Sequence, residues 1–430
     1  MTLVVIGASP AVAAAAATLP VDLVHVRMPG APVLGAGVLG AEVLGAEVLG
    51  ARLRGEYAVD YQHAPAFLPF VDEVLRPLAP GAVVSLTELG LEPAAVAARR
   101  LGAAGVPVEV VRATRDKREM RRVLARKAPH LNPAFAPGDA GTEAVAALFA
   151  GGARVVAKPV AGTGSHAVAL LRTPADLPAD RRNGATLLER YVEGREFSVE
   201  ALSSGGRHTV LGVAEKRTTG DGFVEVAHIM PAPSLTAAER RDVERAVGEL
   251  LDAVGLVDGP SHTEVKVGAD GRVTVIETHN RPGGDGIADL VHLTTGVDWR
   301  RAALGWAVRV PPRTGDVTPV AAAATVFFTA PPGRVGAVAG PPRELGAGGA
   351  GGARGAGAGG ARGAGGVRIV EWDVQVEPGD PVYALRSSAD RLGMAVLAAE
   401  GDAGAAVCAS AVDELMAYQV VVTTQEEDQP

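Results

Sequence analysis

Two acidic residues on one short hairpin constrain this chain more than any other feature of its sequence. The run SHTEVKVG carries Glu264, an Asp270-Gly271 turn follows, and the run VTVIETHNR carries Glu277. An Asp-Gly pair between two strand-like runs is typical of a tight β-hairpin. Glutamates so placed can share one face of neighbouring strands and converge on a single site. A solvent-facing orientation of one or both is an equally open alternative.

A divalent cation is the simplest partner for such a pair. Apolar residues flank both glutamates, and burying two unpaired carboxylates is costly. Oxygen ligands without cysteine favour Mg2+ (or Mn2+), especially when the ion is shared with phosphates. Arg281 follows and leads into Pro-Gly-Gly-Asp-Gly. It could hold a phosphate or neutralise a tetrahedral intermediate, or it could serve as a structural ion-pair partner.

Two further motifs suggest a nucleotide. In VVAKPVAGTGSHAV a strand ends at Lys158 and a glycine turn follows, so backbone N–H groups could close over phosphates. It is not a Walker loop, and a plain hairpin turn is the alternative reading. In TLLERYVEGREFSVEAL a strand reaches residues 189–192, and Glu196 opens the next strand. Such a hinge could read an adenine edge through its backbone, with Glu196 accepting ribose hydroxyls.

Composition narrows the class of protein. Lys plus Arg is 41 and Asp plus Glu is 49, a net charge of −8, which argues against a nucleic-acid partner. The single cysteine, Cys408, permits no internal disulfide, which suits a reducing cytoplasm. The apolar N-terminus has no basic residue before Arg27 and therefore lacks the charged region of a signal peptide. No run is long and apolar enough for a membrane span, so we expect no membrane partner.

The order of patterns predicts an α/β (α+β) protein with three domains. Short apolar runs alternating with Ala-rich stretches predict a Rossmann-like parallel domain over 1–112. A charged helix over 115–128 and then strand-like runs with turn signals predict a second domain over 113–306. A smaller C-terminal domain would cover 307–430, interrupted by a disordered Gly/Ala-rich insertion at 345–366. The repeat at 33–52 matches neither helix nor strand period and predicts a surface loop.

In this order, Lys117, Lys158 with its glycine turn, the hinge with Glu196, the two glutamates and Arg281 resemble the nucleotide site of ATP-grasp ligases. The resemblance covers roughly residues 112–306. FVEVAHIMPAP at 223–233 and HTEVKVGADGRVTVIETHNRPGGD at 262–285 look most like the L-amino-acid ligase (dipeptide-forming) and carnosine-synthase-like carboxylate-amine ligases.

The resemblance implies an ATP-grasp domain of two α+β subdomains, and it implies roles for individual residues. ATP would be bound by Lys117, Lys158, Gly162, Thr163, Gly164, Ser165, Glu189, Arg190, Tyr191, Val192 and Glu196. Glu264 and Glu277 would ligate Mg2+, and Arg281 would be catalytic, steadying the transferred phosphoryl group and the acyl intermediate. The small-molecule carboxylate and amine substrates would meet Glu225, His228, Gly283, Gly284 and Asp285. A homodimer is left open.

The chain departs from the family pattern at one position. After the second metal glutamate the superfamily usually has Glu-x-Asn-x-Arg, but here His279 stands where Asn is usual and Asn280 comes one residue later. Neighbouring residues on a strand point to opposite faces. Either His279 takes the ligand role or the glutamates and phosphate alone hold the second ion.

The implied activity is an ATP-dependent ligase that forms an amide or peptide bond through an acyl phosphate, releasing ADP and phosphate. Two alternatives are carboxylation through carboxyphosphate and a catalytically silent ATP-binding regulatory protein. An NAD-dependent reading of the N-terminal strand lacks the glycine fingerprint and the acidic ribose ligand.

Overall fold

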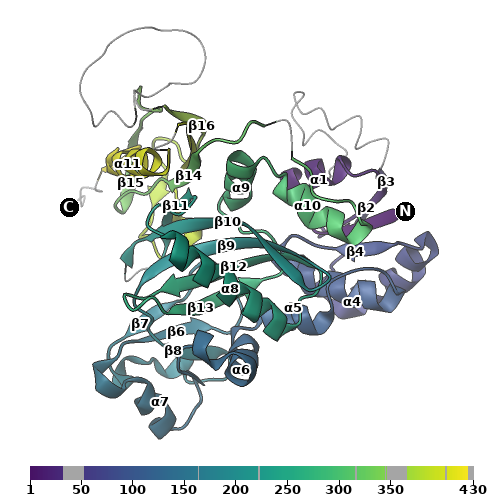
Figure 1. Ribbon diagram of the computed structural model, residues 1–430, viewed down its shortest axis with the longest axis horizontal. Helices are drawn as coiled ribbons and strands as arrows, with labels where there is room; N and C mark the ends of the chain where they lie inside the picture. Colours follow the sequence, from purple (N-terminus) through teal and green to yellow (C-terminus); the bar gives the residue numbers. More distant parts are fainter. Residues whose placement is uncertain are drawn as a thin grey trace.

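A computed structural model describes residues 1–31, 53–162, 164–220, 223–314, 317–343, 345, 366–401 and 404–424. The predicted loop at 33–52, Thr163 and nearly all of the predicted insertion at 345–366 lie outside these residues. Within them the chain is a mixed α/β structure with four sheets (Figure 1), which confirms the predicted fold class.

The first sheet is parallel and belongs to the N-terminal region. Its order is β3-β2-β1-β4, from β1 (Thr2–Ile6), β2 (Asp22–Arg27), β3 (Leu53–Ala58) and β4 (Ala82–Val84). Alternate residues of β1 face two different cores, one shared with α1 (Pro10–Ala17) and the other with α3 (Ala64–Phe70) and α4 (Leu91–Leu101). This is the Rossmann-like arrangement that the alternating runs predict, because a parallel sheet needs helices on both faces.

A small antiparallel sheet forms the opposite end of the molecule, beside α7 (Thr142–Leu148) (Figure 1). Its order is β5-β8-β6-β7, from β5 (Phe135–Pro137), β6 (Val155–Pro159), β7 (Ala169–Leu171) and β8 (Thr186–Arg190). Turns occupy residues 164–167, so the strand after the glycine turn begins only at Ala169. Lys158 therefore lies near the end of a central strand, next to β8.

The largest sheet has eight antiparallel strands, in the order β13-β12-β9-β10-β11-β14-β18-β16. Its bounds are β9 (Arg195–Ser204), β10 (Arg207–Thr218), β11 (Glu225–Met230), β12 (Gly259–Val267), β13 (Val273–His279), β14 (Ala322–Phe327), β16 (Val367–Val374) and β18 (Gly393–Ala399). The sheet continues across residue 306, because β14, β16 and β18 extend it. The domain boundary expected there stays a prediction.

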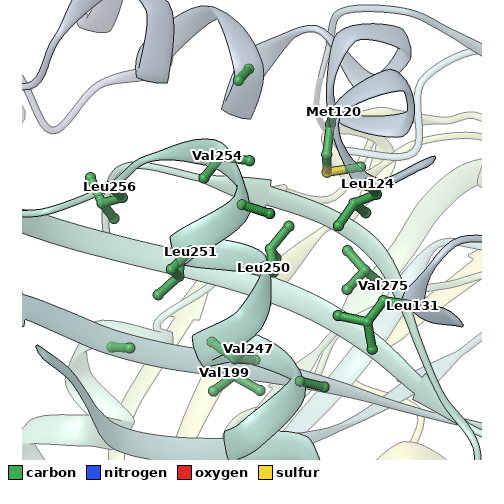
Figure 2. Packing of buried hydrophobic residues seen from close by; sticks show 14 of the residues in the cluster. Met120, Leu124, Leu131, Val199, Val247, Leu250, Leu251, Val254, Leu256 and Val275 are labelled. Atoms are coloured by element: carbon green, nitrogen blue, oxygen red, sulfur yellow. The ribbon is translucent and has the colours of Figure 1, made fainter. Parts of the chain in front are cut away.

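Helices α5 (Val108–Arg115), α6 (Lys117–Lys127) and α8 (Ala237–Val254) pack on this sheet. The Asp116 side chain caps α6, and the Thr236/Glu239 capping box begins α8. Figure 2 shows Leu250 of α8 facing Val275 of the sheet and Leu124 of α6, and Leu251 belongs to the same buried cluster. This core places the N-terminus of α6, and with it Lys117, beside the ends of β6 and β13.

Three more α-helices and the fourth sheet complete the α-helices and strands of the described residues. Helices α9 (Ile287–Thr295) and α10 (Trp299–Gly305) share the core of α1. Helix α11 (Gly404–Ala417) packs on β14 and β18, beside a sheet of β17 (Pro381–Val382), β15 (Gly333–Val338) and β19 (Val421–Thr424). In the described part of the chain, no helix has both the length and the apolar character needed to cross a bilayer.

Candidate active site

The predicted pair of carboxylates lies on adjacent strands of the large sheet. Glu264 of β12 and Glu277 of β13 are direct cross-strand partners, so their side chains share one face. Both are mostly buried, with side-chain exposures of 13% and 18%. The geometry thus selects the inward arrangement from the two that the hairpin pattern left open.

Each of these carboxylates has an ammonium partner. Glu277 lies 2.9 Å from Nζ of Lys117, and Glu264 lies 2.9 Å from Nζ of Lys216 on β10. Burial alone would lower the pKa of both lysines, but the carboxylates outweigh it and raise each pKa. Both lysines therefore stay charged, and each forms an ion pair with one of the two glutamates.

Lys158 belongs to a second buried network. Its Nζ lies 2.8 Å from Glu189, which also accepts a 2.6 Å hydrogen bond from Arg121 of α6. Burial would raise the pKa of Glu189, but Arg121 and Lys158 hold it at about 2. Burial lowers the pKa of Lys158 although Glu189 is adjacent. The Glu189 side chain is therefore engaged by two cations.

The predicted adenine hinge follows directly. The Tyr191 ring lies between the guanidinium of Arg154, 4.3 Å from the ring centroid, and Nζ of Lys266, at 4.7 Å. Lys266 donates to the carbonyl of Val192 at 3.2 Å and lies 3.5 Å from Glu196. The hinge, the candidate ribose carboxylate and an unpredicted lysine thus form one cluster. Arg190 instead donates to the carbonyls of Leu148 and Ala150.

The described residues on either side of Thr163 also contact the site. Gly162 and Gly164 have φ of 129° and 68°, in the range that favours glycine. Lys117 donates to the carbonyl of Gly162 at 2.8 Å, and Ser165 donates to the carbonyl of Phe223 at 2.8 Å. The loop is therefore fastened at both ends to groups that face the same space.

His279 and Asn280 point to opposite faces of β13. Asn280 accepts a hydrogen bond from Thr114 of α5 at 3.0 Å, inside the core. His279 has Nε2 3.2 Å from Glu277 and Nδ1 3.2 Å from Glu88, which follows β4 of the N-terminal sheet. Glu88 also accepts from Arg281 at 2.9 Å. The N-terminal region thus holds both His279 and Arg281 in position.

A buried carboxylate anchors the loop after Arg281. Glu200 accepts hydrogen bonds from Trp299 Nε1 and the Gly283 amide, and its Oε1 lies 2.5 Å from His262 Nδ1. Burial would lower the pKa of His262, but Glu200 and Glu264 raise it to about 9. A Cβ on Gly283 would lie 2.7 Å from His262 and 2.8 Å from Glu200. Only glycine fits this contact.

The remaining predicted substrate residues meet a turn from the C-terminal region. Asp285, in the left-handed region at φ 57°, accepts two hydrogen bonds from Arg391, at 2.9 and 2.6 Å, and lies 3.6 Å from His228. Burial would raise the pKa of Asp285, but His228 and Arg391 hold it far below its usual range. Ser388 of the same turn donates to Glu225 at 3.0 Å and, through its amide, to the carbonyl of Gly164 at 3.1 Å. The turn therefore joins the glycine loop to the substrate side.

These groups surround one cavity of about 380 Å3. It is lined by every predicted site residue in the described chain except Gly283, and also by Lys216, His262, Lys266 and Ser388. Among the described residues, no group of three or more His, Cys, Asp or Glu side chains is arranged to hold a metal ion. Mg2+ is commonly held by one or two carboxylates together with phosphate oxygens and water. The glutamate pair therefore fits Mg2+ shared with a nucleotide, but not a metal held by protein ligands alone.

Comparison with known proteins agrees with this geometry. A family profile described as an ATP-grasp domain matches residues 178–289, which include Glu264, Glu277 and Arg281. An L-amino acid ligase from Bacillus licheniformis has the same fold over 99% of both chains, with a TM-score of 0.73 and 21% identity. This chain contains an ATP-grasp domain.

Two other relatives differ in their chemistry. The alanine–anticapsin ligase of Bacillus amyloliquefaciens is 24% identical over 264 residues, which are 52% of this chain and 53% of that protein. The chain thus spans about half the length of this curated relative. The biotin carboxylase domain of Hydrogenobacter thermophilus 2-oxoglutarate carboxylase, solved with MgADP and bicarbonate, has a TM-score of 0.60 and 16% identity over 93% of this chain and 86% of that one. Ligases and carboxylases both have the ATP-grasp fold, so the fold alone does not distinguish the two chemistries.

Sequence reasoning missed several residues that line the cavity or contact its lining. His262 and Lys266 alternate with Glu264 on one strand, so period-two spacing could have found them. Lys216, Glu88, Glu200 and Ser388 carry no such signal, because their partners are remote in sequence.

Proposed function

We propose that this chain is an ATP-dependent carboxylate-amine ligase that joins an amino acid, or a similar acid, to an amine or a second amino acid. One observation carries the proposal: the glutamate pair, Lys117, Lys158 and Arg281 all face a single cavity. The similarity to alanine–anticapsin ligase supports ligation over carboxylation.

In the proposed reaction a carboxylate oxygen attacks the γ-phosphorus of ATP, and the bond to the β-phosphate oxygen breaks to release ADP. The amine then attacks the acyl carbon, the carbon–oxygen bond to phosphate breaks, and the nitrogen loses a proton. Mg2+ (or Mn2+) on Glu264 and Glu277 would neutralise phosphate charge. Lys117 and Lys158 would align the phosphates, and Arg281 would stabilise the transferred group and the tetrahedral intermediate.

The other assignments follow from the same proposal. Phosphates would lie under the loop 162–165, adenine would lie along Glu189, Arg190, Tyr191 and Val192, and ribose would bind Glu196. The substrates would meet Glu225, His228, Asp285 and the Gly283-Gly284 turn. We further propose the domain limits 1–112, 113–306 and 307–430 and a cytoplasmic location; a homodimer stays a prediction.

The test is to measure ADP and phosphate release with Mg2+ and ATP across pools of amino acids, with Glu277→Gln as the inactive control. Release that requires two substrates supports ligation, and release that requires bicarbonate supports the carboxylase alternative. AMP in place of ADP contradicts the acyl-phosphate route. Tight ATP binding without turnover in any pool favours the regulatory alternative.

A separate measurement tests where the nucleotide lies. Lys158→Ala should abolish ATP binding in a calorimetric titration, because the variant loses a buried cation that faces the proposed phosphates. Unchanged affinity in a folded variant would mean that the nucleotide binds elsewhere.

A further inference from the structure

Lys216 is the most densely paired charge in the cavity. Its Nζ lies 2.8 Å from Glu196, 2.9 Å from Glu264 and 3.2 Å from Glu225. The three carboxylates come from three different strands, β9, β12 and β11, and the lysine side chain is only 2% exposed. One buried ammonium therefore compensates three carboxylates at once.

Under the proposed function, these three carboxylates serve three different ligands. Glu196 would bind the ribose, Glu264 the metal and Glu225 the substrate. The second metal carboxylate, Glu277, has its own ammonium partner in Lys117 at 2.9 Å. Both carboxylates proposed to hold a divalent ion are thus already paired with a lysine.

We propose that Lys216 is an internal counter-cation that keeps free divalent metal off Glu264, so that the metal enters only together with a nucleotide. The inference rests on the proposed function for the identity of the ligands. A metal ion and an ammonium compete for the same carboxylate oxygens and repel each other. A free ion must therefore displace Lys216 without any compensating anion.

A nucleotide changes this balance. Its phosphates offer Lys117 an alternative partner and supply the metal with oxygen ligands that the protein lacks. Glu264 can then turn to the metal while Glu196 and Glu225 retain Lys216. By this exchange Lys216 links the ribose, metal and substrate positions, and it acts as a positioning residue rather than a catalytic one.

The test measures the affinity for Mn2+ without any nucleotide. Electron paramagnetic resonance quantifies the Mn2+ that stays free. Replacing Lys216 with methionine removes the charge and leaves three buried carboxylates uncompensated, so we expect Lys216→Met to bind Mn2+ about tenfold or more tightly than wild type. The matched control is Lys266→Met. It removes a cavity lysine that forms an ion pair with Glu196 but, within the described residues, none with Glu264. We expect the control to bind Mn2+ much as wild type does.

A double variant locates the ion. Adding Glu264→Gln to Lys216→Met should return Mn2+ affinity to the wild-type level, because the released carboxylate is gone. If Lys216→Met binds Mn2+ no more tightly than Lys266→Met does, or if the double variant keeps the gain, the proposal is overturned.

The wild-type protein offers a second test that does not depend on a variant folding. Its Mn2+ affinity should rise about tenfold or more when a non-hydrolysable ATP analogue is added. Equal Mn2+ affinity with and without the analogue overturns the proposal. Neither measurement needs turnover. A failure to release ADP would contradict the proposed ligase activity, while the Mn2+ affinities would still decide the role of Lys216.

Discussion

Glu264 and Glu277 face each other directly across the β12–β13 ladder, and a β-bulge follows Glu264 immediately. A bulge bends its strand and re-aims the neighbouring side chains. The extra residue here is Ile276 of β13, which lets Glu277 share the cavity face with Glu264 although Val275 is fully buried in the core beneath α8. The proposed metal position thus depends on the register of one hairpin.

Removing either carboxylate should therefore disable the reaction. We expect Glu264→Gln and Glu277→Gln each to reduce ADP release by about a hundredfold or more, since each removes a carboxylate proposed to hold the metal that neutralises the phosphates. A coupled assay at saturating ATP measures this. Glu109→Gln, at an exposed position of α5, is the control and should retain full activity. Near-normal rates in Glu277→Gln would contradict the assigned metal site.

Acid should weaken the fold through Glu189. Its pKa of about 2 lies below the ordinary 4.5, so its ionised form stabilises the folded chain above about pH 4.5. That contribution is lost as the pH falls toward 2. We expect the difference in unfolding free energy between wild type and Glu189→Gln to be largest near neutral pH and to shrink below pH 4.5. Urea titrations at several pH values measure it, and a difference that does not change with pH would contradict the assigned pKa.

The core beneath α8 should be sensitive to a cavity. Leu250 is fully buried against the sheet (Figure 2). Leu250→Ala should lower the free energy of unfolding by about 2–5 kcal/mol. Arg241→Ala, at an exposed position of the same helix, should change it by less than about 0.5 kcal/mol. Chemical denaturation of both variants checks the pair, and equal losses would show that this core does not carry the stability.

The single cysteine should be inert in the folded protein. Cys408 lies on the buried side of α11, and burial raises the pKa of its thiol to about 12. Since the thiolate is the reactive form, a thiol reagent at mildly alkaline pH should label it only as fast as the chain opens. Denaturation should then expose one thiol per chain. Rapid stoichiometric labelling of the native protein would contradict this.

Much of the site could be predicted because its signals are local. The Asp-Gly turn, period-two alternation and the glycines after Lys158 each report on neighbouring residues. They were enough to indicate where Glu264, Glu277 and Lys158 lie. The distinction between His279 and Asn280 also follows from alternation, and the hydrogen bond from Thr114 to Asn280 agrees with it.

Local patterns did not reveal which basic side chain pairs with which carboxylate. Lys216 reaches three carboxylates on other strands, Glu88 crosses from the N-terminal region to Arg281, and Ser388 joins Glu225 to the glycine loop. The sequence by itself determined the strands, the hairpin and the residue types that face the cavity. The tertiary structure alone decided their charge partners, because the strength of a buried ion pair depends on distance and on exclusion of water, which spacing along a chain does not encode.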